Sequence, residues 1–381
     1  MSAPEKGKTM QLSLSQTNLN FEKSKFQSKK GHKNKKIRNR GVNRANIAYN
    51  IATVPLTLVS SGILGQMKKI KLNDQETDNF AKAVDKGLKD SKLFDKGVRA
   101  YTVEYVEEGS GSIIKDTIDA LRNLIPGKKV AEENIKKATE TATKTAKETL
   151  SGIKECDKNA YDALKEEIGC SKPIKKLAKS LGANMERVKE LLADSMASMF
   201  KSGNNACYLS HANKIITPDK VLRTSAFHEM GHALNANGGI ILKSLQNMRP
   251  VKSLAPLVLL IGLANKRKTT DKTNENDSKI QKTKDFVKRN AGKLAFLTYA
   301  PMVLEEGLAS LRGENVARKL VKSGDLSKEL FKKVKLTNAC GFATYVLGAV
   351  SVALATKLAI KVKDDIQAKH EQKIQNKKSM I

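Results

Sequence analysis

The stretch TSAFHEMGHALNANGG, residues 224–239, carries the pentapeptide HEMGH at positions 228–232. Ahead of it, Thr-Pro-Asp at 217–219 predicts a helix start, because Thr is a favoured N-cap, Pro a favoured first helical residue, and Asp complements the positive end of the helix dipole. Asn-Gly-Gly at 237–239 is a strong C-terminal signal. The sequence therefore predicts a helix from about Pro218 to Ala236, with HEMGH inside it.

The spacing within this pentapeptide indicates a metal site. Residues four apart lie on one face of a helix, so His228 and His232 can present imidazole nitrogens to the same ion. Glu229 projects beside them and can take a proton from water at the metal without being a ligand. Gly231 leaves room for another element to pack closely. The alternative is a chance match on a very basic chain.

Two imidazoles leave a zinc ion short of its usual three protein ligands. The only histidine after His232 is His370, in the charged tail, so a carboxylate is expected as the third ligand. The best candidates lie in PMVLEEGLASLRGENVARKL, residues 301–320. There, Glu305 and Glu306 are predicted to start a helical stretch after an apolar run.

These residues resemble the motifs of gluzincins, zinc metallopeptidases with HExxH on one helix and a ligand Glu on a later one. Glu306-Gly-Leu-Ala309 is similar to their Glu-Gly-x-Ala motif. Together with Ser310 and Arg312, it matches a Glu-x-x-Ala-Ser-x-Arg pattern of bacterial membrane zinc metallopeptidases, and HEMGHALN resembles their first motif. The resemblance covers about residues 204–320.

The resemblance implies a metalloendopeptidase with one Zn²⁺ per chain and a peptide or protein substrate. His228, His232 and Glu306 would be the metal ligands, and Glu229 the general base. Glu305 remains the alternative third ligand. Where the family often has an Asp four residues after the ligand Glu, this chain has a serine, so a hydroxyl replaces a carboxylate.

A hydrogen-bond donor for the oxyanion is also expected. The candidates for this role, or for substrate binding, are Tyr208, His211 and Tyr299, each weighed against a core or solvent-exposed position. Residues 204–220 predict a short strand or hairpin. By the resemblance, the strand near Cys207–Leu209 would lie along the cleft and pair with an extended substrate.

The predicted fold is mainly α with a small β element. A zincin-like core is expected over residues 201–335, interrupted by a mobile polar insertion at 266–290. Residues 68–200 are predicted to be a helical region of unknown role, with a long exposed helix over 131–155. None of the four cysteines forms a CxxC pair, which excludes a ribbon-type zinc site.

Uncharged apolar stretches suggest contact with a membrane. Segments 45–67 and 336–360 are predicted as candidate transmembrane helices, because each is long enough to span. Two shorter runs, 253–264 and 294–304, could form a hairpin dipping into lipid. Buried core helices are the alternative. Both termini are basic, which by the positive-inside rule places both in the cytoplasm.

The chain is strongly basic, with 70 Lys and Arg against 39 Asp and Glu, a formal charge of +31. Residues 1–44 are predicted to be disordered and 361–381 to be a charged tail. Residues 23–44 hold ten Lys or Arg and no acid, which favours an anionic membrane surface. Nucleic-acid binding is weaker, because base-stacking aromatics are not interleaved.

These features favour a membrane-associated protein, of a bacterial inner membrane if the resemblance holds, with a cytoplasmic protein as the alternative. Two rival functions stay open: a catalytically inactive zincin-like scaffold, and a basic protein binding nucleic acid or anionic membrane with an accidental HExxH.

Overall fold

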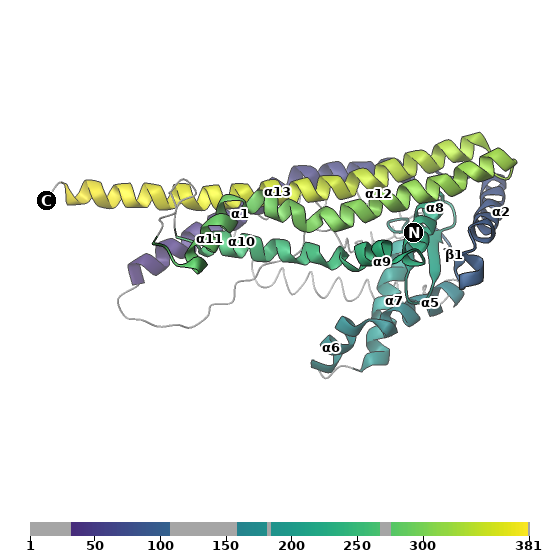
Figure 1. The fold of residues 1–381 in the computed structure, drawn as a ribbon, viewed down its shortest axis with the longest axis horizontal. Helices are drawn as coiled ribbons and strands as arrows, with labels where there is room; N and C mark the ends of the chain where they lie inside the picture. Colours follow the sequence, from purple (N-terminus) through teal and green to yellow (C-terminus); the bar gives the residue numbers. More distant parts are fainter. Residues whose placement is uncertain (1–31, 107–157, 181–183, 267–275, 380–381) are drawn as a thin grey trace, which may run out of the picture. The chain divides into compact units, whose positions relative to one another are not determined.

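A computed structural model describes residues 32–106, 158–180, 184–266 and 276–379 (Figure 1). The helix predicted over 131–155 lies outside them. The described residues are mainly helical, with one three-stranded sheet. The chain forms two compact units. The described parts of the first are residues 61–106, 158–180, 184–246 and 304–343, and those of the second are residues 32–60, 247–266, 276–303 and 344–379.

The first unit is built on a sheet with strand order β1-β3-β2. Its strands are β1 (Arg99–Val103), β2 (Cys207–Leu209) and β3 (Lys214–Pro218). β1 runs parallel to β3, and β2 antiparallel to it at the edge. The predicted hairpin within 204–220 is confirmed as β2 and β3. β1 is a strand within residues 68–200, which were predicted to be a helical region.

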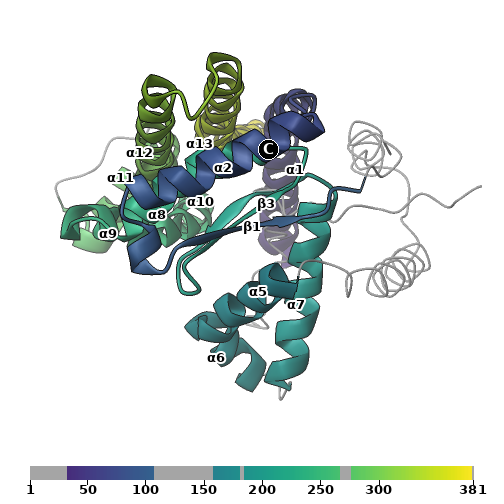
Figure 2. The same ribbon diagram turned by 90° about the vertical axis from the view of Figure 1, so that its right-hand side faces the viewer.

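Helices cover both faces of this sheet, as Figure 2 shows. Successive residues of a strand face opposite sides, so Ile215 and Ile216 of β3 enter different cores. Ile215 packs with Phe227 and Met230 of helix α8, and Ile216 with Phe200 of helix α7. The covering helices are α2 (Asp74–Asp90) and α8 (Ala226–Ala236) on one face, and α5 (Lys158–Cys170) and α7 (Met185–Lys201) on the other.

The HEMGH helix α8 starts later than predicted. Thr217 and Pro218 end strand β3, paired with β1, and are neither cap nor first turn. The Thr217 hydroxyl accepts a hydrogen bond from the buried Arg223 guanidinium at 3.1 Å instead of capping a helix. A single turn of 3₁₀ helix, η2 (Arg223–Ser225), leads into α8. The predicted end at Ala236 is confirmed.

The carboxylates lie inside a long helix, not at the start of one. Helix α12 runs from Ala291 to Ser323 with Pro301 within it, so the apolar run 294–304 and the Glu305–Glu306 pair are continuous. The predicted mobile insertion 266–290 is also wrong in part, because 279–289 forms helix α11. The remaining elements are η1 (Phe94–Lys96), α6 (Lys172–Ser180), α9 (Ile240–Asn247), η3 (Arg249–Leu254), α10 (Ala255–Ala264), α11 (Lys279–Arg289) and α13 (Lys328–Lys378).

Two of the described helices are long and apolar enough to cross a membrane: Arg44–Lys68 in α1 (His32–Lys68), and Lys328–Asn376 in α13. The most apolar window is 0% buried in α1 and 28% buried in α13, whereas a core helix would be mostly buried. Helix α1 starts at His32, which corrects the predicted disorder of 1–44 from that residue on. The charged tail 361–381 likewise continues α13 to Lys378.

Candidate metal centre

Helices α8 and α12 cross at backbone contact. A Cβ added at Gly231 would overlap the carbonyl oxygen of Ala309, and one at Gly313 would overlap that of Phe227. Phe227 of α8 contacts Gly313 of α12, and Gly231, further along α8, contacts the earlier Ala309 of α12. The two helices are therefore antiparallel. The room predicted at Gly231 is filled by α12. This crossing sets the HEMGH face directly against the two adjacent glutamates of α12.

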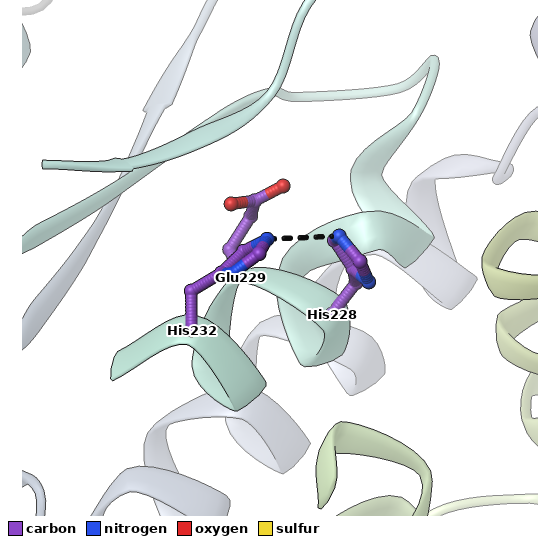
Figure 3. Close-up of side chains that lie close together, drawn as sticks. All are labelled: His228, Glu229 and His232. Atoms are coloured by element: carbon purple, nitrogen blue, oxygen red, sulfur yellow. Dashed lines mark hydrogen bonds between the residues drawn. The ribbon is translucent and has the colours of Figure 1, made fainter. Parts of the chain in front are cut away.

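Three potential ligand atoms converge at the crossing. His228 Nε2 lies 3.0 Å from His232 Nε2 and 3.1 Å from Glu306 Oε2. His232 Nε2 lies 3.3 Å from the same Glu306 oxygen. Figure 3 shows the two imidazoles turned toward each other from successive turns of α8. All three side chains are buried.

The other nitrogen of each imidazole is also engaged. His228 Nδ1 lies 3.0 Å from the Ser310 hydroxyl, and His232 Nδ1 lies 2.8 Å from Glu305 Oε1. An ionised carboxylate can only accept, so His232 donates through Nδ1. That bond favours the tautomer whose Nε2 lone pair is free to bind a metal. Ser310 thus reaches the histidine where the family pattern has an Asp.

The alternative ligand Glu305 therefore contacts the far side of His232. It is fully buried, and Asn235 Nδ2 donates to the same Glu305 oxygen at 3.1 Å. Arg312 in turn donates to Asn235 Oδ1 at 3.2 Å and to the Leu234 carbonyl at 2.8 Å. Asn235 was not predicted; its sequence signal is its position three residues after His232, on the same helix face.

Negative charge dominates this buried group. Glu229, Glu305 and Glu306 are all buried beside two imidazoles. Burial by itself lowers the pKa of His232, but hydrogen bonds to Glu305 and Glu306, with the charges of Glu306 and Glu229, outweigh it and raise the pKa to about 10. A metal bound at Nε2 would compete with a proton for this nitrogen, so its binding would release a proton and depend on pH.

Glu229 projects from α8 toward the strands, beside the imidazoles (Figure 3). Burial first, and then the negative charge of Glu229, raise the pKa of the Cys207 thiol. Cys207 is the first residue of the edge strand β2. Helix α8, which carries Glu229, also contacts strand β2 directly.

The buried His and Glu groups could hold a metal ion. Zinc binds nitrogen and oxygen ligands at about 2.0–2.1 Å, so tetrahedral geometry separates the ligand atoms by roughly 3.3 Å. The three separations among His228, His232 and Glu306 are 3.0 to 3.3 Å, so these atoms lie at or slightly inside that spacing, and at hydrogen-bond distance from one another. Two imidazoles with one carboxylate also suit zinc better than magnesium or calcium, which prefer all-oxygen sets.

The three candidate oxyanion or substrate-binding residues have other contacts. The Tyr208 hydroxyl donates to Asn213 Oδ1 at 2.6 Å. His211 is exposed at the β2–β3 turn, with Nδ1 2.9 Å from Glu167 Oε1 of α5. Tyr299 is buried in an apolar cluster of the second unit. The oxyanion role of all three stays a prediction.

Comparison with protein-family models, curated proteins and solved structures found no match to this chain. The resemblance to gluzincins therefore rests on the two short motifs, residues 228–235 and 306–312. Both motifs lie at one helix crossing, so the part of the resemblance that can be placed in space is consistent with one site.

Proposed function

We propose that this protein is a zinc-dependent peptide hydrolase in which His228, His232 and Glu306 hold the metal and Glu229 is the general base. The observation that carries the proposal is the triangle of two Nε2 atoms and one Oε2 atom, with edges of 3.0 to 3.3 Å. Each imidazole has a partner at Nδ1, which supports a held orientation rather than a chance encounter.

Charge balance supports the same proposal. Burying an unpaired carboxylate is costly, and here Glu229, Glu305 and Glu306 are buried around one point. A divalent cation would offset two of these negative charges. The outer contacts through Ser310 and Glu305 resemble in kind the partners that orient metal-bound histidines and raise their basicity.

Zinc, when bound, supplies Lewis acidity for the scissile carbonyl and a water of lowered pKa. Glu229 accepts a proton from the attacking water and then delivers it to the leaving amine. Strand β2 is the outer strand of the sheet in the described residues, and an extended substrate would add a strand beside it by main-chain hydrogen bonds. Its nearness to Glu229 would place a bound peptide beside the base.

Metal content tests the site directly. The purified full chain should contain about one zinc per chain, and His228→Ala should contain almost none. His211→Ala is the matched control, because that exposed imidazole contacts Glu167 and is not one of the three proposed ligands, so this variant should keep its zinc. If wild type and His228→Ala contained the same amount of zinc, the metal would bind at another site. If wild type contained no zinc, the HEMGH motif would be a chance match.

Substituting the two adjacent glutamates one at a time should lower the zinc affinity of the protein to different extents. Glu306→Gln removes an anionic ligand and should weaken binding strongly. Glu305→Gln keeps an oxygen that can accept a hydrogen bond from His232 Nδ1 and removes only the negative charge. Its zinc affinity should therefore fall by nearer tenfold. Competition with a fluorescent chelator measures both. A larger loss for Glu305→Gln than for Glu306→Gln would exchange their roles.

A further inference from the structure

An apolar groove of about 340 Å³ lies in the second unit. Its lining includes Val251, Leu254, Leu257 and Ile261 from η3 and α10, with Leu294 and Leu297 from α12. Thr298 is the one polar side chain among its lining residues. Leu254, Leu257 and Leu297 are 48%, 51% and 59% exposed, so the groove is open at the surface.

Helix α10, which forms one wall, has no polar face. Its sequence APLVLLIGLA is apolar all round, yet only Ala255, Leu259, Gly262 and Leu263 are buried. Such a helix is typical of an apolar surrounding rather than of water. Ten residues rise about 15 Å, half of the roughly 30 Å hydrocarbon core of a bilayer. The helix matches the depth of one leaflet.

Helix α11 buries charged side chains and exposes apolar ones, the reverse of the pattern in a helix of a soluble protein. It buries Asp285 and Lys288, while Ile280 is 69% exposed and Phe286 59% exposed. Its remaining basic side chains are also exposed, namely Lys279, Lys282, Lys284 and Arg289. Exposed apolar and basic side chains on one helix are typical of a segment at the membrane–water interface.

A buried polar network fixes α11 at one end of the groove. Lys288 Nζ donates to Asp364 Oδ1 at 2.6 Å and to the Asn265 carbonyl at 3.3 Å. Asn265 Nδ2 donates to Asp285 Oδ1 at 2.7 Å. Asn265 directly follows α10, and α12 begins two residues after α11 ends. The basic helix therefore lies where both apolar walls meet, and its Val287 lines the groove.

We propose that this groove binds an acyl chain of an anionic phospholipid, whose headgroup is held by the exposed lysines and arginine of α11. The chemistry selects this occupant. An apolar lining cannot satisfy the backbone of an extended peptide, and the exposed basic side chains of α11 repel a second copy of a chain with charge +31. A phospholipid complements both the apolar walls and the basic end.

The chain contains no tryptophan, so a single introduced tryptophan can report on the groove by its fluorescence. Leu297→Trp places a single reporter in the groove, and Leu192→Trp, at an exposed leucine of α7, is the matched control. The full chain is reconstituted in vesicles containing brominated phosphatidylglycerol or brominated phosphatidylcholine at the same fraction. Bromine quenches indole fluorescence only at contact, so the readout reports which lipid occupies the groove.

We expect the Leu297→Trp reporter to be quenched more by brominated phosphatidylglycerol than by brominated phosphatidylcholine. Neutralising Lys282 and Lys284 to glutamine should reduce that preference about fivefold for each charge. The pair Lys175→Gln and Lys176→Gln on α6 should leave it unchanged. Equal quenching by the two lipids, or quenching no stronger than at Leu192→Trp, overturns the proposal.

A second tryptophan reporter tests whether the result depends on misfolding of the Leu297→Trp variant. Leu257→Trp probes the opposite wall and should show the same preference. Zinc content measured on the same samples reports the site of the first unit separately. The lipid proposal therefore stands or fails independently of peptide hydrolysis.

Discussion

Replacing Glu229 by glutamine should abolish peptide hydrolysis while leaving zinc bound. The amide keeps the shape of the side chain but cannot accept a proton from water, and loss of a general base typically costs about 100- to 10,000-fold in rate. The triangle of ligand atoms from His228, His232 and Glu306 does not involve Glu229, so metal content should stay near wild type. Release of amino groups from unfolded casein measures the rate.

The control for this substitution is Glu314→Gln on α12, which removes a carboxylate that has no described contact with the triangle and should leave the rate unchanged. Loss of zinc in Glu229→Gln would show that Glu229 is a ligand and would refute the assignment. A wild-type protein that holds zinc yet cleaves no peptide under any condition would instead be the inactive scaffold.

The histidine pair is the part of the site that local sequence specifies. The two imidazoles can reach one ion provided that residues 228–232 are helical. The neighbouring apolar positions and the Asn-Gly-Gly stop are enough to predict that helix. The choice between Glu305 and Glu306 could not be made in this way. Both are fully buried, and both contact His232, one at each ring nitrogen. Only the helix crossing distinguishes them.

The predicted start of α8 failed because a distant strand overrides a local cap. Thr-Pro-Asp at 217–219 has the composition of a helix start, but β1 pairs with these residues from more than 100 positions earlier. Asp219 accepts a hydrogen bond from the Tyr105 backbone N–H at 2.8 Å instead of favouring a helix dipole. Parallel pairing of this kind leaves no signal in the nearby sequence.

Helix α11 was missed for a related reason. The segment 266–290 is polar and was predicted to be mobile, since polar runs usually lie in solvent. In the structure, Asp285 and Lys288 are buried against Asn265 and Asp364, so the polar side chains themselves make the packing contact. A sequence pattern that assumes apolar residues inside cannot predict a helix that buries its charges.

The second large effect should come from Gly313, which is not predicted to touch the metal. An alanine there would place its Cβ on the Phe227 carbonyl, a backbone atom that cannot move aside without shifting the helix. Separating α8 from α12 should destabilise the first unit by about 4 kcal/mol or more. It should also carry Glu306 away from the histidines, so that zinc is lost together with stability. Thermal unfolding and metal content measure the two effects.

Gly307→Ala is the matched control in the same helix. Its added Cβ would lie 3.2 Å from the Phe342 ring, a side chain that can turn away, and alanine gains about 1 kcal/mol in helix propensity over glycine. Its unfolding should therefore stay close to wild type. If Gly313→Ala also unfolded like wild type and kept its zinc, the backbone contact between α8 and α12 would not exist as described. The juxtaposition of HEMGH with Glu306 depends on that contact, so the proposed metal centre would fail with it.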